Sequence, residues 1–387
     1  MKNVGIVGQK MKKVGIVSLY YGNYNYGGLL QAYALVKSIV KIGFDAEQIC
    51  VKMDGRKSIR PFIKVPGKIK KALIKKYYNR KVKERNEKFC DFMKSIPHSK
   101  ESYTWRTIKE TNYLYDVFVC GSDQIWNPNY MRNNNKIPYM LSFVEDERKK
   151  VSYAASIGVS KLTDSEAHDL NEAAKSFCAL SLREESAKKL FDEELQKRIS
   201  IVLDPTLLLT SKEWVQQEQP VNTPERYIFC YFLGSSRTNR KKAVEISKEL
   251  GIPILISPYT NPASGMADIG FGDVRVINAG PKEFLYLIHH AELVITDSFH
   301  ACVFSMQFKR PFLVLPRDNK DNKSSMHSRL FDFANKFHLQ NQLMFEKDKK
   351  FDPQCLEVNW ELAYEVIEQE REKSYNYLKS ALSEINV

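Results

Sequence analysis

The 387-residue sequence lacks the features that define several common classes of protein. It has no run of about eighteen consecutive apolar residues, so we expect no membrane-spanning helix. Its first residues contain lysines and a short apolar stretch but no small-residue cleavage site, so we expect no secretory signal. The seven cysteines include no C-x-x-C pair, which favours buried free thiols over a zinc site or a disulfide framework.

Positive charge is abundant, and the formal net charge is +13 at pH 7. Basic residues crowd together between Lys52 and Lys88, where apolar residues recur at helical spacing. This pattern predicts a basic amphipathic helix at about 64–95. The helix could be a solvated face, or it could contact an anionic membrane surface or a pyrophosphate-bearing acceptor. We expect no nucleic-acid partner, because no nucleic-acid-binding motif accompanies the charge.

Short β-branched segments alternate with helical periodicity along almost the whole chain, a pattern typical of parallel α/β proteins. Lys13–Leu19 is an expected strand, and Leu29–Val40 is the helix expected to follow it. A polar segment with two prolines at 216–225 is an expected linker, and the alternation restarts beyond it. The sequence therefore predicts two Rossmann-like domains, at 11–215 and 226–350.

The two ends of the chain differ from this pattern. MKNVGIV at Met1 is nearly repeated by MKKVGIV at Met11, and one copy alone can form the first strand. We therefore treat residues 1–10 as an appendage or an alternative start. Residues 351–387 are expected to form a helical extension that crosses back over both domains. Ligands of doubly wound domains bind outside the carboxyl ends of the strands, so the cleft between the domains is the expected site.

The first candidate ligand loop follows the first expected strand and contains Asn25, Tyr26, Gly27 and Gly28. Glycines let backbone amides approach a ligand, and the start of a helix favours an anion or a sugar hydroxyl. The segment is not G-x-G-x-x-G, and no P-loop lysine follows it. A tight turn and a ligand loop therefore both remain open.

A second candidate lies where an apolar strand ends in a glycine turn at Val119–Asn127. It places Trp126 beside Asp123 and Asn127, and sugars bind to such combinations of an aromatic ring with carboxylate and amide groups. The alternative is that Trp126 packs against a neighbouring loop.

Arg183 is expected at the carboxyl end of another strand. An arginine there can bind a carboxylate or a phosphate through two hydrogen bonds. The alternative is an ion pair with Glu184 or Glu185.

The sharpest candidate follows the apolar strand Leu293–Thr296. Asp297 and Ser298 are both good N-cap residues, and His300 is expected in the first turn of the following helix. A histidine there lies beside free backbone N–H groups, where phosphate binds, and it exchanges a proton near neutral pH. We interpret His300 as functional rather than structural.

Taken in order, these segments resemble the polysaccharide pyruvyl transferases over nearly the whole chain, from Met11 to about Leu343. The resemblance rests on six stretches in the right order, namely Asn25–Leu35, Tyr115–Asn127, Ser152–Gly158, Leu182–Ser186, Leu203–Thr206 and Thr296–His300. Two departures are Ala301-Cys302, where glycine and a small hydroxyl residue are more usual, and Gly28, where alanine is usual.

The resemblance implies a fold similar to the GT-B glycosyltransferases. It also implies phosphoenolpyruvate as donor substrate, a sugar diol as acceptor, and a pyruvate ketal as product, with no cofactor or metal. The family's histidine falls on His300 and its donor-binding arginine on Arg183, which we expect to act with Asp297 and Ser298 on the donor side.

We assign the two candidate loops, Asn25–Gly28 and Asp123–Asn127, to the acceptor side, in the first domain. The expected acceptor is an oligosaccharide or a lipid-linked precursor, reached in the cytoplasm or at the inner face of the membrane. A GT-B glycosyltransferase using a nucleotide sugar and an inactive glycan-binding homologue are the alternatives.

Overall fold

The computed structural model describes residues 11–53, 70–258, 266–317, 328–345 and 350–384, and of residues 70–77 it describes the backbone alone. These residues form two five-stranded parallel sheets with the same topology. The strand order is β3-β2-β1-β4-β5 in the first sheet and β10-β9-β8-β11-β12 in the second. Both are doubly wound, so the expected pair of Rossmann-like units is confirmed.

The strands are short and apolar because they are buried on both faces. In β4, for example, Val117 and Val119 join one core cluster, whereas Phe118 and Cys120 join another. The strands of the first sheet are β1 (Lys13–Val17), β2 (Asp45–Val51), β3 (His98–Tyr103), β4 (Val117–Cys120) and β5 (Lys150–Ser152). Beside β5 lies a pair formed by β6 (Leu180–Leu182) and β7 (Ile199–Ile201). The strands of the second sheet are β8 (Ile228–Tyr231), β9 (Ile254–Ile256), β10 (Val274–Arg275), β11 (Leu293–Thr296) and β12 (Phe312–Val314).

Helices connect these strands, and their ends follow local capping signals. Thr163 and Glu166 form a capping box at the start of α4, and Gly251 ends α7 in the left-handed conformation. The helices of the first half are α1 (Tyr26–Lys41), α2 (Lys70–Ser95), α3 (Lys136–Tyr139), α4 (Asp164–Lys175), α5 (Glu193–Arg198) and α6 (Ser211–Val215). Those of the second half are α7 (Arg237–Leu250), α9 (Pro281–His289), α10 (Phe299–Gln307), α11 (Ser328–Lys336) and α12 (Trp360–Ser383).

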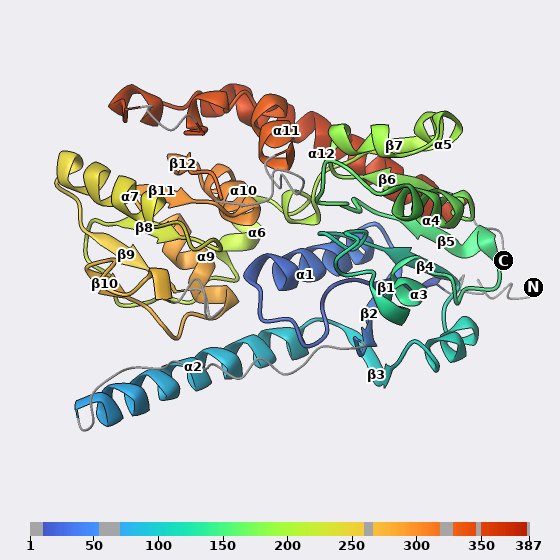
Figure 1. The fold of residues 1–387 in the computed structure, drawn as a ribbon. Coiled ribbons are helices and arrows are strands. Elements are labelled where there is room, and N and C mark those ends of the chain that lie inside the picture. Colours follow the sequence, from blue (N-terminus) through green and yellow to red (C-terminus); the bar gives the residue numbers. More distant parts are fainter. Residues whose placement is uncertain (1–10, 54–69, 259–265, 318–327, 346–349, 385–387) are drawn as a thin grey trace, which may run out of the picture.

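Helix α12 crosses from the second half back to the first, as expected (Figure 1). Near its start the hydroxyl of Tyr364 donates to the carbonyl of Gln307 in α10. Further along, the hydroxyl of Tyr377 donates to the carbonyl of Ser152 in β5 over 2.8 Å. One terminal helix therefore contacts both halves.

The two halves share one continuous core, which contains Val14 of β1 and Val294 of β11. Residues 216–225, the expected linker, carry no helix or strand and lie between α6 and β8. The domain boundaries stay predictions, because the apolar packing does not stop at this segment. Residues 1–10 lie outside the described part of the chain.

Helix α2 runs below both halves in Figure 1 and contacts the second. Arg85 of this helix is buried, and its Nη1 donates to the carbonyl of Pro258 over 2.8 Å. Lys88 forms an ion pair of 2.6 Å with Glu283 in α9. The later turns of the predicted basic helix are thus an interface with the second half. Residues 64–69 and the side chains of 70–77 lie outside the described residues.

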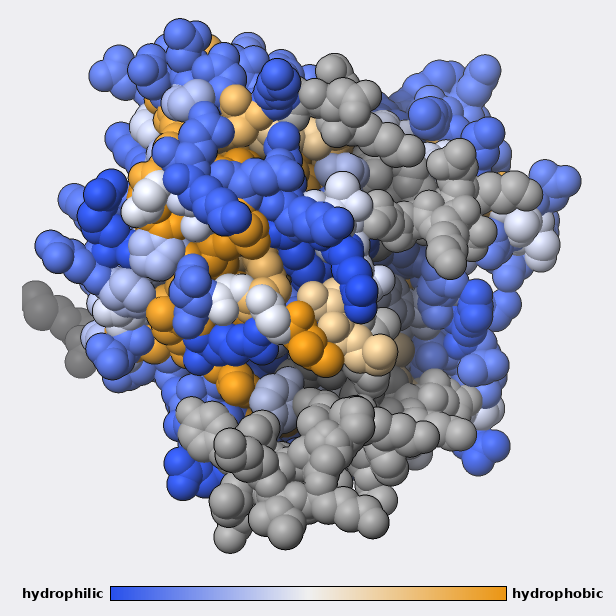
Figure 2. All heavy atoms as spheres, turned by 60° about the vertical axis from the view of Figure 1, so that its left-hand side comes forward, coloured by the Kyte–Doolittle hydropathy of each residue, from blue (hydrophilic) through white to orange (hydrophobic). Residues whose placement is uncertain are grey.

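The surface of the second half is shown in Figure 2, where apolar side chains gather on one side of the view between many hydrophilic ones. Exposed apolar residues of this half include Met266 and Ile269. None of the helices in the described ranges is long and apolar enough to cross a membrane.

Candidate active site between the two sheets

The centre of the site is Arg183, which follows β6 and has 3% of its side chain exposed. Its Nη1 lies 2.7 Å from Oδ2 of Asp204, and its Nε donates to Oε1 of Glu184 over 3.0 Å. Its Cζ lies 4.2 Å from the ring centre of Phe299, in the first turn of α10. The expected alternative of an ion pair with Glu184 is therefore present, and Asp204 is a second partner. Glu185 is exposed.

His300 lies in the first turn of α10, as predicted, and it contacts Asp204 of the first half from the second half. Its Nε2 is 3.5 Å from Oδ2 of Asp204, and its ring packs against Gly27 of α1. A Cβ atom added at Gly27 would lie 2.0 Å from Nδ1 of His300. The imidazole therefore occupies space that only a glycine leaves open at this position.

Asp204 is held in its ionised form by these neighbours. Burial by itself raises the pKa of this carboxyl, but His300, Arg183 and Thr206 outweigh burial and leave the pKa well below its usual range. Oδ1 of Asp204 accepts hydrogen bonds from the hydroxyl of Thr206, over 2.6 Å, and from its backbone N–H, over 3.0 Å. A fixed negative charge thus lies between Arg183 and His300.

A second arginine, Arg329 of α11, is also buried beside Phe299. Burial and then the charge of Arg183 lower the pKa of Arg329 to about 10, although Glu184 and Asp123 act in the opposite direction. The charged form of Arg329 is therefore destabilised by its surroundings. A bound anion would offset this cost.

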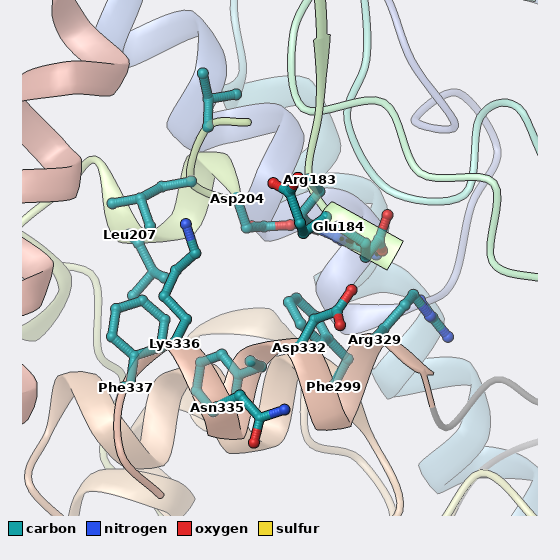
Figure 3. Close-up of a pocket in the computed structure, with 14 residues that line it drawn as sticks. Arg183, Glu184, Asp204, Leu207, Phe299, Arg329, Asp332, Asn335, Lys336 and Phe337 are labelled. Atoms are coloured by element: carbon teal, nitrogen blue, oxygen red, sulfur yellow. Dashed lines mark hydrogen bonds and ion pairs between the residues drawn. The ribbon is translucent and has the colours of Figure 1, made fainter. Parts of the chain in front are cut away.

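These residues border a cavity of about 450 Å³ (Figure 3). Its inner wall carries Arg183, Glu184 and Asp204, and α11 forms much of the opposite wall. The remaining lining residues include apolar and polar side chains, namely Glu185, Val202, Leu203, Leu207, Phe299, Arg329, Asp332, Phe333, Asn335, Lys336 and Phe337. The cavity thus combines buried charges with an aromatic wall.

Four buried polar atoms in this region make no hydrogen bond among the described residues, namely Arg183 Nη2, Glu184 Oε2, His300 Nε2 and Arg329 Nε. Two of them still lie near a carboxylate oxygen, Arg183 Nη2 at 3.0 Å from Glu184 and His300 Nε2 at 3.5 Å from Asp204. Buried polar groups are nearly always hydrogen-bonded, so such a group calls for a ligand or another specific explanation. Three of the four atoms are nitrogens on residues that carry or can acquire a positive charge. The arrangement suits an anionic ligand.

The part of the chain that contains Arg183, Asp204 and His300 also matches a known protein family. Residues 25–319 match the family model described as polysaccharide pyruvyl transferase. The chain belongs to the polysaccharide pyruvyl transferase family. The resemblance carried by its six sequence stretches is thereby confirmed. No match was found among curated proteins.

Several solved structures of low sequence identity are similar to this chain over most of its length. The UDP-GlcNAc 2-epimerase from Methanocaldococcus jannaschii is 12% identical, with a TM-score of 0.50 over 92% of each chain. The UDP-GlcNAc 2-epimerase from Neisseria meningitidis is 11% identical, with a TM-score of 0.49 over 96% of this chain and 97% of that one. The glycosyltransferase SnogD from Streptomyces nogalater is 12% identical, with a TM-score of 0.45 over 97% and 99% of the two chains. The Methanocaldococcus jannaschii structure thus shares its overall fold with this pyruvyl transferase family member, and the two doubly wound units joined by α12 form the expected GT-B-like architecture.

The first expected acceptor loop is not a loop in this family member. Tyr26, Gly27 and Gly28 belong to the first turn of α1, and Asn25 is its N-cap, accepting from the N–H of Gly28. Tyr26 is buried, and its hydroxyl donates to the carbonyl of Ala279 over 2.8 Å. Its ring stacks on Phe284. Tyr26 joins the two halves, and its burial removes its side chain from contact with an acceptor. Acceptor contact by Asn25, Gly27 and Gly28 stays a prediction.

The second expected acceptor segment is also largely internal. Trp126 is fully buried, its Nε1 donates to the carbonyl of Tyr139, and its ring packs against Phe177, so it cannot stack on a sugar. The packing alternative describes this residue. Asn127 is buried as well, whereas Asp123 reaches the site, with Oδ1 at 3.8 Å from Nη1 of Arg183.

The two predicted cap residues of α10 have different roles. Asp297 is buried and accepts hydrogen bonds from the N–H groups of Leu233 and Gly234, over 2.7 and 2.8 Å. Its carboxylate therefore fixes the loop after β8. Ser298 is the N-cap residue of α10, but its side chain makes no capping hydrogen bond. Direct contact of either residue with a donor stays a prediction.

Sequence reasoning missed Asp204 and Arg329 as site residues. Asp204 lies in one of the six stretches that carry the resemblance, and its position after a strand and before Pro205 was an available signal. Arg329 had no such signal, because α11 was not expected and only the tertiary packing brings it to Arg183.

Among the described residues, one group has the spacing of a metal site, namely Glu218, His289 and His290, whose ligand atoms lie within 4.8 Å of one another. Nδ1 of His289 lies 2.7 Å from Oε1 of Glu218. None of the three lines the cavity at Arg183.

We expect Gly27→Ala to impair the site through His300. The added methyl group must displace the imidazole, and overpacking of this kind typically costs about 1–3 kcal/mol of stability. Phosphate release and thermal unfolding measure the two effects. Lys37→Ala, at an exposed position of the same helix, is the control. Unchanged kinetics in Gly27→Ala would show that the position of His300 does not matter.

Proposed function

We propose that this protein transfers the pyruvyl group of phosphoenolpyruvate onto a sugar diol of a bacterial surface glycan precursor. The product is a cyclic pyruvate ketal, and phosphate is released. Membership of the family supports this proposal. The observation that carries it is the convergence of buried nitrogens of Arg183, His300 and Arg329 that make no hydrogen bond of their own near the start of α10. Phosphoenolpyruvate carries a carboxylate and a phosphate, and both accept strong hydrogen bonds from such groups.

The reaction forms two C–O bonds at C2 of phosphoenolpyruvate and one C–H bond at C3. It breaks the bond from C2 to the phosphate oxygen and the π bond between C2 and C3. The two hydroxyl groups release two protons, which balance one proton added at C3 and one that leaves with phosphate. In this proposal His300 delivers a proton, Arg183 and Arg329 hold the anion, and no cofactor or metal takes part. Transfer by a positioned acid is typically worth about 10²–10⁴ in rate.

Ligand-dependent thermal stability tests the donor. We expect phosphoenolpyruvate to raise the melting temperature, because binding to the folded state stabilises it, and UDP- and GDP-sugars to have no effect. The reverse result would favour a GT-B glycosyltransferase, since one fold supports both activities. Stabilisation by glycans without phosphate release from phosphoenolpyruvate would favour an inactive glycan-binding protein.

We further propose an oligosaccharide or lipid-linked acceptor on the cytoplasmic side, with the basic helix touching the anionic inner face of the membrane. The side chains of Lys70, Lys71, Lys75 and Lys76 lie outside the described residues. Flotation with anionic vesicles, before and after charge reversal at these four lysines, measures whether they bind the membrane.

A further inference from the structure

We propose that the outer part of the cavity is a subsite for the acceptor sugar, formed by Asp332 of α11 and the aromatic side chains beside it. This inference rests on the proposed function, because it places the acceptor next to the donor. It differs from the sequence-based expectation, which assigned the acceptor to two segments whose aromatic side chains, Tyr26 and Trp126, are buried in the fold.

Four carboxylates line the cavity; Glu185 is exposed, and the other three divide into two groups. Glu184 and Asp204, on the inner wall, are both bonded to Arg183. Asp332, on the outer wall, has no ion-pair partner within the described ranges. Lys336, one helical turn later, does not neutralise it, because this lysine is paired with Glu370 of α12 at 2.5 Å. An uncompensated carboxylate disfavours an anionic ligand but accepts hydrogen bonds from neutral hydroxyl groups. The outer part therefore suits the sugar and the inner part the anionic donor.

Asp332 is held in place by one of its two oxygens. Its Oδ2 accepts a hydrogen bond of 3.0 Å from the N–H of Ser186. Its other oxygen has no hydrogen bond to any residue that the structure describes. Figure 3 shows the carboxylate pointing from α11 toward Glu184, across the cavity, whereas the amide of Asn335 points away. One oxygen thus remains to bind a hydroxyl group beside the anion site.

The wall around Asp332 is apolar and aromatic. Phe299, Phe333, Phe337 and Leu207 all line the cavity. Small-molecule sites typically combine such apolar walls with a few polar groups that fix orientation. A sugar ring has this character, because its C–H face packs on aromatic rings while its hydroxyl groups need acceptors. The site therefore fits a sugar whose hydroxyls face inward to phosphoenolpyruvate.

The test separates donor binding from acceptor binding. Calorimetry first measures the Kd of phosphoenolpyruvate. Saturation-transfer NMR then measures binding of p-nitrophenyl glycosides of glucose, galactose, mannose and N-acetylglucosamine. We expect Asp332→Asn to lower the affinity for the glycoside that binds by about 10-fold or more, as for loss of a hydrogen bond to a charged group. The Kd of phosphoenolpyruvate should stay unchanged. Asp91→Asn, the same substitution at an exposed position of α2 that does not line the cavity, should change neither constant.

Each outcome has a distinct meaning. Failure of the wild-type protein to bind phosphoenolpyruvate overturns the proposed function, whatever the glycosides do. Normal donor binding with equal glycoside affinity in wild type and Asp332→Asn overturns the subsite alone. The subsite is also overturned if none of the four glycosides binds, or if Asp91→Asn weakens binding as much as Asp332→Asn.

Discussion

His300→Ala is expected to lower the turnover number by about 100-fold or more, within the range for loss of a general acid. The imidazole lies at the start of α10, 3.5 Å from the buried carboxylate of Asp204, and its Nε2 has no hydrogen-bond partner in the described structure. Steady-state phosphate release measures turnover. The affinity for phosphoenolpyruvate should fall less in this variant than in Arg183→Ala, because the histidine mainly supplies a proton.

The matched control is His290→Ala. His290 is exposed at the end of α9 and does not line the cavity, so its loss should leave turnover unchanged. Turnover of His300→Ala within threefold of the wild type would make His300 a structural residue. The acid would then have to be another group in the cavity.

Arg183→Ala is expected to weaken both the fold and the binding of phosphoenolpyruvate. The substitution leaves Asp204 and Glu184 buried without their cation, and breaking a buried ion pair typically costs about 3–5 kcal/mol of the free energy of unfolding. Because Arg183 is buried, its loss affects the fold as well as the binding site. Urea unfolding measures stability, and calorimetry with phosphoenolpyruvate measures binding.

Arg148→Ala is the control for stability. Arg148 also pairs with a carboxylate, Asp146, but 76% of its side chain is exposed, so water replaces the partner. We expect its unfolding curve to match the wild type. If Arg183→Ala unfolds at the same urea concentration as the wild type, the buried ion pairs of Arg183 contribute little to the free energy of unfolding. If the variant does not fold, Arg183→Lys retains the charge without the two-pronged geometry and allows binding to be measured.

Much of the fold followed from local patterns. The strand Leu293–Thr296, for example, was predicted with the bounds that the structure shows. Apolar runs between helical segments identify such buried strands without knowledge of their neighbours. The predicted helix began three residues too late, at Leu29 instead of Tyr26. Gly27 and Gly28 read as a turn in the sequence, whereas in the structure they lie in the first turn of α1, which Asn25 caps. Strand β3 was not predicted, since its exposed and buried residues show little alternation.

The site residues also fall into those that local patterns indicated and those that they did not. Arg183 was found because it stands directly after a strand, and His300 because it lies in the first turn of the helix that follows one, where ligands of parallel sheets gather. Trp126 was misassigned, because its neighbours in sequence are polar whereas its neighbours in space are Phe177 and Phe191. A sequence shows which residues adjoin along the chain, and burial depends on those that approach from elsewhere.

The sequence by itself determined the parallel α/β class, the family, and two of the central residues, because strand periodicity and strand-end motifs are local properties. The tertiary structure alone decided that Asp204 lies between Arg183 and His300, that Gly27 leaves room for the imidazole, and that Arg329 and Asp332 of α11 border the cavity. These relations join segments that are far apart in the chain. They depend on how two sheets and α11 pack around one core, which no local pattern specifies.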